Sequence, residues 1–160
     1  MAYVQLLGST SDWIDGSAVS NYFWGNRWQA ALSGTLKQIR CFTTGNVNVK
    51  VAIYADNAGE PSTRLAYTSG NALTTGENFI NMSDVSIVAG NYYWLAENND
   101  GSKFGGQAGG ASRIKAATYS TYTFPNPAGS GYSVYICELC ISGWGELPSN
   151  SNPRCQVIIM

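Results

Sequence analysis

The four cysteines of this chain are the residues whose type and spacing most suggest chemistry. Two residues separate Cys137 from Cys140, which is the gap found in zinc knuckles and in redox-active pairs. The chain contains no histidine and no second pair with this spacing, so the ligand set of a zinc site is incomplete. We therefore interpret the cysteines as buried thiols or as one structural bridge that joins Cys155 to Cys137 or Cys140. The disulfide candidates are Cys41, Cys137, Cys140 and Cys155, and their pairing stays open.

Acid–base catalysis would have to come from carboxylates, because imidazole is the side chain that titrates near neutral pH and the chain has none. The absence of histidine excludes Ser-His-Asp and Cys-His nucleophiles. Two carboxylates placed across a cleft could still hydrolyse a glycosidic bond. Most of the 10 Asp and Glu residues stand beside Gly, Asn, Ser or Pro, where a carboxylate more often caps a turn. We therefore expect a protein that is not an enzyme.

Two acidic turns have the oxygen-bearing side chains that calcium binds. One contains Asp56 and Asn57 with Glu60, and the other is the run 97–101 around Asp100. Neither run has the twelve-residue calcium-loop pattern, and Asn and Asp are ordinary residues of hairpin turns. The turn interpretation is preferred, so we expect no cofactor, with calcium as the one that stays open.

Aromatic residues could form a platform for sugar rings, because a ring face presents flat apolar area while neighbouring amides bond hydroxyl groups. The segment 119–131 is rich in Gly, Pro and Ser, which predicts an exposed loop, and such loops often carry recognition. Trp94 is instead expected to fill the core. The candidate ligand-binding residues are Tyr119, Tyr122, Phe124, Trp24 and Trp28.

Composition favours protein contacts over other partners. Charged residues make up 12% of the 160 residues, about half the usual ~25%, and low charge is typical of interface cores. The 9 basic residues do not cluster, which disfavours nucleic acid. No apolar run approaches the ~18 residues of a membrane helix. The glycine-rich segment 100–112 is expected to be a mobile loop or an arm ordered against a neighbouring subunit, and residues 157–160 an edge strand that pairs with another chain.

Short alternating runs separated by turn residues must position these side chains. In the run 47–54, Val47, Val49, Val51 and Ile53 alternate with other residues, the period of a strand with one face in the core. No window of ten or more residues shows apolar residues at the spacing of an amphipathic helix. The pattern predicts one all-β domain over residues 1–160, a sandwich, jelly roll or barrel. Further predicted strands are 3–7, 19–24, 28–32, 36–42, 64–68, 78–82, 85–87, 92–97, 114–119, 132–137, 139–144 and 156–159.

Three motifs between Gly34 and Asn98 carry a family resemblance. They are residues 34–39, residues 49–56 followed by Gly-Glu-Pro-Ser at 59–62, and residues 88–96. This part of the chain resembles a jelly-roll-type β-sandwich module of phage virion proteins and bacterial surface proteins. The resemblance implies an antiparallel β-sandwich of jelly-roll type and a non-catalytic module at a virion or cell surface, and it carries no catalytic residue onto this chain.

Together these observations predict a structural or decorating component of a virion or extracellular surface assembly, which acts as a homo-oligomer or with other surface proteins. The N-terminus has neither the basic start nor the apolar stretch of a secretory signal. Two explanations stay open: either a natural signal is missing from this sequence, or the protein reaches the outside as virion proteins do. We expect the second, because the sequence resembles a complete short gene product. The alternative is a secreted carbohydrate-binding module that uses the loop aromatics to bind glycans. A small two-carboxylate glycosidase is the remaining hypothesis.

Overall fold

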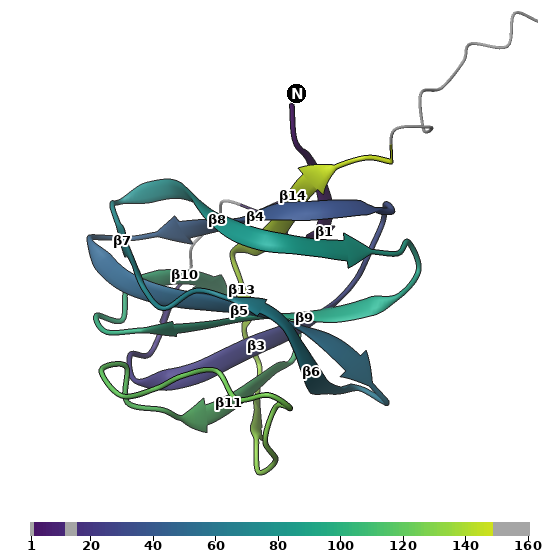
Figure 1. The fold of residues 1–160 in the computed structure, drawn as a ribbon. Coiled ribbons are helices and arrows are strands. Elements are labelled where there is room, and N and C mark those ends of the chain that lie inside the picture. The colour runs from purple at the N-terminus through teal and green to yellow at the C-terminus, as the bar shows by residue number, and fades with distance from the viewer. Residues whose placement is uncertain (1, 12–15, 149–160) are drawn as a thin grey trace, which may run out of the picture.

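The computed structural model describes residues 2–11 and 16–148, and within them the chain forms strands without a helix. The strands lie in two antiparallel sheets that pack face to face as a β-sandwich (Figure 1). This confirms the predicted all-β sandwich class, while its jelly-roll type stays a prediction. The strands are β1 (Val4–Gly8), β2 (Gly16–Ala18), β3 (Tyr22–Gln29), β4 (Gly34–Thr43), β5 (Val47–Asn57), β6 (Glu60–Tyr67), β7 (Asn71–Leu73), β8 (Gly76–Ile87), β9 (Tyr92–Asn99), β10 (Phe104–Gln107), β11 (Ser112–Ala116), β12 (Ser133–Tyr135), β13 (Glu138–Leu139) and β14 (Ile141–Glu146).

Two sheets make the layers of the sandwich. The first, which we call the β4 sheet, has the strand order β1-β14-β4-β10-β13, with β8 paired to β4 and β2 paired to β10. The second, which we call the β9 sheet, has the order β12-β11-β3-β9-β5-β6, with β7 paired to β5. In Figure 1, β8, β4 and β14 form the upper layer, and β5, β9 and β3 lie beneath them. Because β14 lies between β1 and β4, the beginning and the end of the described chain meet in one sheet.

The main core lies between the two sheets and is filled by side chains from both. Val49, Val51 and Ile53 of β5 are fully buried in it, as their alternation predicts. The residues that alternate with them along the strand were expected to face solvent, but two of these, Ala52 and Tyr54, are also fully buried. The expectation of a single buried face is therefore wrong for β5, since the β9 sheet is covered on its outer face too.

Residues 117–132, which connect β11 to β12 and which we call the covering loop, pack over that outer face. Phe124 is 1% exposed. Its ring meets those of Phe23 and Tyr54 edge to face, with centroids 6.0 and 6.3 Å apart. The predicted exposed loop at 119–131 is therefore wrong for this residue, because the aromatic rings of the sheet gain more from apolar contact with the loop than from water.

The backbone of the covering loop is held by side chains that rise from the β9 sheet. Buried carbonyl groups need hydrogen-bond donors, and this loop forms no strand that could supply them. Long polar side chains of the sheet donate instead. The bonds are Lys50 Nζ to the carbonyl oxygens of Tyr119 (2.5 Å) and Tyr122 (2.7 Å), Tyr54 Oη to that of Pro125 (3.0 Å), Lys115 Nζ to that of Ser130 (2.7 Å), and Arg64 Nη1 to that of Phe124.

The glycine-rich segment 100–112 is not the unpacked loop or arm that its composition predicts. It contains β10, which pairs with β2, β4 and β13, and Phe104 in this strand is fully buried. A Cβ atom on Gly106 would lie 2.9 Å from the sulfur of Cys137, so glycine lets the strand pass close to that thiol. The strand predicted at 157–160 lies outside the described residues.

Replacing Phe124 with alanine is expected to lower the free energy of unfolding by about 3–5 kcal/mol, the usual cost of removing a buried phenylalanine ring. Urea unfolding followed by circular dichroism measures the change. Thr123→Ala is the matched control, because the neighbouring Thr123 side chain is exposed, and its effect should stay within about 0.5 kcal/mol. Equal unfolding midpoints for the two variants would show that the loop is not part of the core.

Candidate functional site

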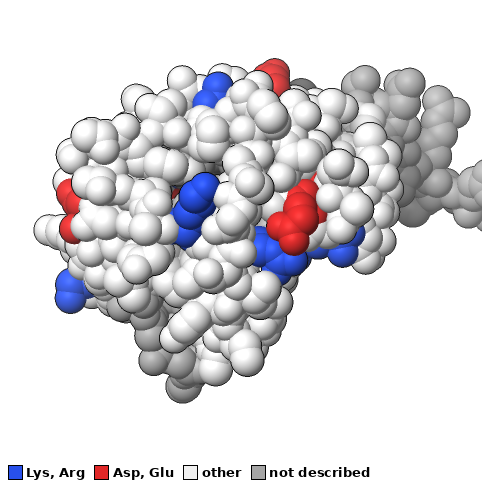
Figure 2. All heavy atoms as spheres, turned by 90° about the horizontal axis from the view of Figure 1, so that it is seen from below, with Lys and Arg blue, Asp and Glu red and all other residues white. Residues whose placement is uncertain are grey.

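Charged side chains are few on the surface and occur in small, separate groups (Figure 2). Several of these groups are ion pairs that join different strands, so opposite charges satisfy each other. Three such pairs are Arg27–Asp56 (2.8 Å), Lys37–Asp84 (2.7 Å) and Arg113–Glu60 (2.7 Å). Across residues 2–11 and 16–148 there is no helix that could span a membrane.

Both carboxylate oxygens of Asp56, a candidate calcium ligand, accept hydrogen bonds from donors of the same chain. Its Oδ1 accepts hydrogen bonds from Arg27 Nε (2.8 Å) and from Trp94 Nε1 (2.8 Å). Its Oδ2 accepts from Arg27 Nη2 (2.9 Å) and from the Gly59 amide (3.3 Å). The Arg27 bond is the largest cause that lowers the pKa of Asp56, and the Trp94 and Gly59 bonds add to it. The oxygens of Asp56 therefore hold the turn together, and neighbouring Asn57 is exposed.

Asp100, the other acidic candidate, closes the turn after β9. Its Oδ1 accepts a hydrogen bond from the Asn48 amide (2.9 Å), and its Oδ2 accepts one from Asn48 Nδ2 (2.8 Å). Within the described ranges, no three Asp, Glu or Cys side chains come together in a group that could hold a metal ion. Neither acidic turn presents a cluster of free oxygens to a cation.

Three of the four cysteines, Cys41, Cys137 and Cys140, lie in the sandwich as buried or half-buried side chains. Cys41, on β4, and Cys137 carry free thiols. Burial is the main cause that raises the pKa of both thiols, well above the ordinary value for Cys41. Because the thiolate is the form that attacks substrates and binds metals, this environment disfavours both roles. Cys140 is fully buried, and Cys155, with its predicted bridge, lies outside the described residues.

The aromatic residues of the covering loop do not form an open platform. Phe124 belongs to the second core, which is the buried cluster between the covering loop and the outer face of the β9 sheet. Tyr122 packs against Phe124 edge to face, with ring centroids 5.2 Å apart. The ring of Tyr119 lies beside Lys50 Nζ, 4.5 Å from its centroid. The structure therefore brings Tyr119, Tyr122 and Phe124 close together, but their rings contact the side chains of the β9 sheet and do not form a surface that is open to a ligand.

The two tryptophan candidates of β3 face the main core. Trp24 is 4% exposed, and its Nε1 donates to the carbonyl oxygen of Val19 (3.1 Å). Trp28 is partly buried against the same core. Trp24 lies nearly perpendicular to the ring of Tyr135, with centroids 5.3 Å apart, and both residues line a depression.

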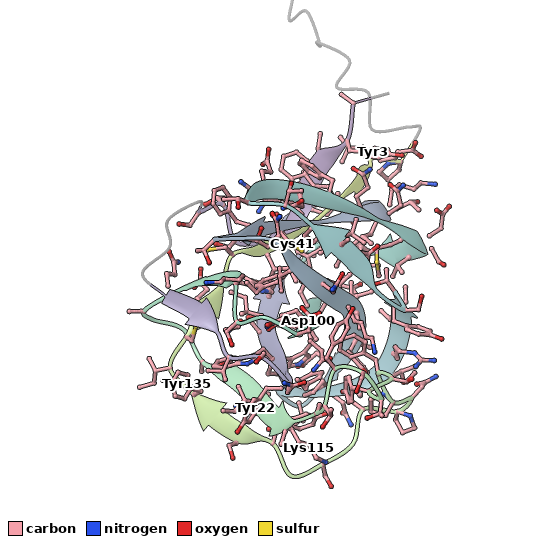
Figure 3. The ribbon with its side chains drawn as sticks, turned by 90° about the vertical axis from the view of Figure 1, so that its left-hand side faces the viewer. Tyr3, Tyr22, Cys41, Asp100, Lys115 and Tyr135 are labelled. Carbon is pink, nitrogen blue, oxygen red and sulfur yellow. The ribbon has the colours of Figure 1, made fainter. Side chains whose placement is uncertain are left out.

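An apolar surface at the edge of the β9 sheet was not predicted from the sequence. Three consecutive residues at β12, Val134, Tyr135 and Ile136, are 61%, 53% and 75% exposed. Beside them is a depression of about 220 Å³, which Val19, Tyr22, Trp24, Ile114 and Tyr135 line. We call residues 134–136 and this depression the edge patch; Figure 3 shows Tyr135 and Tyr22 on the same side of the molecule. Three apolar residues in succession at a strand were the available signal, since alternation would bury every second one.

Glu97, which the sequence places in the acidic turn 97–101, lies instead within β9. It is fully buried, and burial raises its pKa well above the ordinary value. Asn99 Nδ2 donates to its two oxygens (3.2 and 3.1 Å), and Asn99 Oδ1 accepts from the Ser102 amide (2.7 Å). The carboxyl group is closed off from solvent and linked to the turn after β9, so its position serves the core and reaches no substrate.

Neither a family model nor a curated protein matches the chain. The fold and these surfaces define a β-sandwich with low surface charge and one apolar edge. Functional inference therefore rests on the geometry of the edge patch and of the two outer sheet faces.

Glu97→Gln is expected to remove a pH dependence of stability. The raised pKa means that the folded protein keeps a proton which the unfolded chain releases above about pH 4.5. Wild-type stability is therefore full below that pH and falls as the pH rises, by up to about 1.4 kcal/mol per unit. Urea unfolding at pH 5, 6.5 and 8 should show that the free energy of unfolding of the variant rises relative to that of the wild type at each step. Parallel curves would contradict the raised pKa.

Asp56→Asn is expected to act in the opposite pH range. The lowered pKa of Asp56 contributes stability at neutral pH that is lost as the pH falls below the ordinary value of 3.8. We expect the variant to unfold about 1 kcal/mol more easily at pH 7, as for a partly exposed ion pair, and this difference should shrink as the pH is lowered to 2.5. A difference that persists unchanged in acid would show that the Arg27 pair is not its source.

Proposed function

We propose that this chain is a non-enzymatic structural or decorating component of a virion or extracellular surface assembly, and that it acts through protein–protein contacts between copies of itself. The observation that carries the proposal is the edge patch. The resemblance of residues 34–98 to a module of virion and surface proteins supports the location, and the low surface charge (Figure 2) supports contacts with protein.

The edge patch has the two properties of a sheet edge that binds protein. β12 pairs with β11 on one side, and in the described residues no strand pairs with its other side, so its backbone groups can extend the sheet. Tyr135 lines the neighbouring depression, and Val134 and Ile136 on either side of it in the chain are also apolar and exposed. Exposed apolar groups of this kind mark interaction sites on proteins.

The edge patch is held in place before any partner binds. Asn26, which is 3% exposed, donates to the carbonyl oxygen of Cys137 (3.0 Å) and accepts from the Leu139 amide (3.0 Å). Ser112 Oγ donates to the carbonyl oxygen of Tyr135 (3.1 Å). These bonds fix the chain on both sides of Ile136, so little conformational freedom is left to lose on association.

A second copy of the chain is the occupant that suits this patch. Ile136 projects into solvent a few residues from a depression lined by apolar side chains. Because a twofold interface brings the same surface together from both copies, one patch has to supply both a projection and a recess. Antiparallel pairing of two β12 strands would join the two β9 sheets at the same time.

The loop aromatics support the carbohydrate-binding alternative less well. A sugar platform needs ring faces that solvent can reach, whereas Phe124 is 1% exposed and Tyr122 packs on it. The covering loop acts as part of the core, and the exposed aromatic residues of this chain lie elsewhere.

Light scattering with size-exclusion chromatography tests the proposal. The expected result is a species of at least twice the 17.2 kDa chain mass that persists with reductant and with chelator. Ile136→Asp, which places a charge in the apolar patch, should weaken association by about 30-fold or more, the factor for 2 kcal/mol at an interface hot spot.

Val88→Asp is the matched control, because Val88 is also an exposed aliphatic residue, 49% exposed, and lies outside the edge patch. It should leave the mass unchanged. A wild-type protein that is monomeric at all concentrations would overturn self-association. An oligomer that Ile136→Asp does not weaken would place the contact on another surface.

A further inference from the structure

The outer face of the β4 sheet carries a second surface, which is independent of the edge patch. Strands β1, β14, β4 and β8 lie side by side in this sheet. In Figure 1 they form the upper layer, and no described segment crosses above them. The β9 sheet, in contrast, has its outer aromatic residues covered by a loop. Side chains on the open face of the β4 sheet are therefore available to a ligand.

Two aromatic residues meet on this open face. Phe79 of β8 is 45% exposed, and its ring lies perpendicular to that of Trp144 of β14, with centroids 5.8 Å apart. The two rings reach each other across β4, which pairs with both strands. Trp144 Nε1 donates to Ser142 Oγ (2.9 Å), so the indole is held in place before any ligand binds. The cross-strand ring contact stabilises the sheet, but it leaves aromatic area in contact with water.

Amide side chains lie in the same row as Trp144. The strand registers place Gln5, Trp144, Gln38 and Asn81 opposite one another on four neighbouring strands. Gln38 Nε2 donates to Asn81 Oδ1 (2.8 Å). This bond uses the donor of one amide and the acceptor of the other, so the Gln38 oxygen and the Asn81 nitrogen can still bond a ligand. Each is a group that hydrogen-bonds hydroxyl groups well.

The charged side chains on this face are paired with one another. Lys37 Nζ contacts Asp84 at 2.7 Å and Glu146 at 3.7 Å, and Arg40 pairs with Glu77. Two cations against three carboxylates leave these groups a net charge of −1, which disfavours an anionic ligand. What distinguishes this face is exposed aromatic area next to amide donors and acceptors, a combination that matches a molecule with apolar ring faces and many hydroxyl groups.

We infer that the outer face of the β4 sheet binds a neutral oligosaccharide, with Trp144 and Phe79 contacting sugar ring faces and Gln38 and Asn81 bonding sugar hydroxyls. A protein partner fits less well, because this face is lined by amides, hydroxyls and paired charges, while the apolar surface of the chain is at the edge patch. The inference differs in site and in ligand from the proposed self-association, so each can fail without the other.

Native affinity electrophoresis tests the inference with defined probes. Gels are cast with one neutral polysaccharide each, namely β-glucan, xylan, galactomannan and dextran, and one gel contains the acidic polysaccharide alginate. The expected result is slower migration in at least one neutral gel, with Trp144→Ala and Phe79→Ala each weakening binding by at least about tenfold, the factor for 1.4 kcal/mol. Tyr67→Ala is the matched control, since Tyr67 is 42% exposed on the β9 sheet, and it should bind as the wild type does.

A nuclear magnetic resonance titration keeps the test valid if a variant folds poorly. Oligosaccharide from the best neutral gel, added to wild-type protein, should shift the indole signal of Trp144 and the side-chain amide signals of Gln38 and Asn81. Normal migration in every gel would overturn the inference. Retardation by alginate alone would overturn the neutral ligand, and shifts confined to residues of the β9 sheet would overturn the site.

Discussion

Burial of the β9 sheet on both of its faces is the constraint on which the rest of the structure depends. Its central strand β9 is buried over residues 93–99, so both rows of its side chains need partners. The inward row meets the β4 sheet, and the outward row, which includes Trp94, meets the covering loop. Polar groups in such a place lose stability unless they are hydrogen-bonded. Asn98 Nδ2 donates to the carbonyl oxygens of Tyr22 and Ala117 (2.8 Å each), which ties β3 and the start of the loop to β9, while its buried Oδ1 has no hydrogen-bond partner among the described residues.

The same constraint connects the core to the surface. The covering loop runs from β11 to β12, so the lysine and arginine side chains that hold its carbonyl groups also determine where β12 lies. The strand itself is held by its pairing with β11. Because Asn26 secures the chain just beyond residues 134–136, the edge patch is rigid from both directions. The position of the edge patch therefore depends in part on how the covering loop packs on the outer face of the β9 sheet.

Local patterns in the sequence predicted the elements but not the faces they bury. Alternation in β5 identified Val49, Val51 and Ile53 correctly, because side-chain period is a local property of a strand. The burial of Phe124 depends on aromatic residues of three other strands, and nothing in a Gly- and Pro-rich segment reveals that they lie beneath it. The candidate site residues also depend on contacts that the local sequence does not reveal. Asp56 has the local sequence of a turn, whereas its Arg27 and Trp94 partners come from strands brought near only by folding.

The use of charge explains why both proposed binding surfaces depend on uncharged groups. The chain has 9 basic and 10 acidic residues, and those with resolved partners hold strands and loops together. Glu60 illustrates this, because its pKa is lowered mainly by the Arg113 bond that joins β6 to β11. A carboxylate bound in this way gains little from leaving its partner for a ligand, since both charges would have to be solvated again. Backbone edges, amides and aromatic rings carry no such cost, and the edge patch and the outer face of the β4 sheet are built from them.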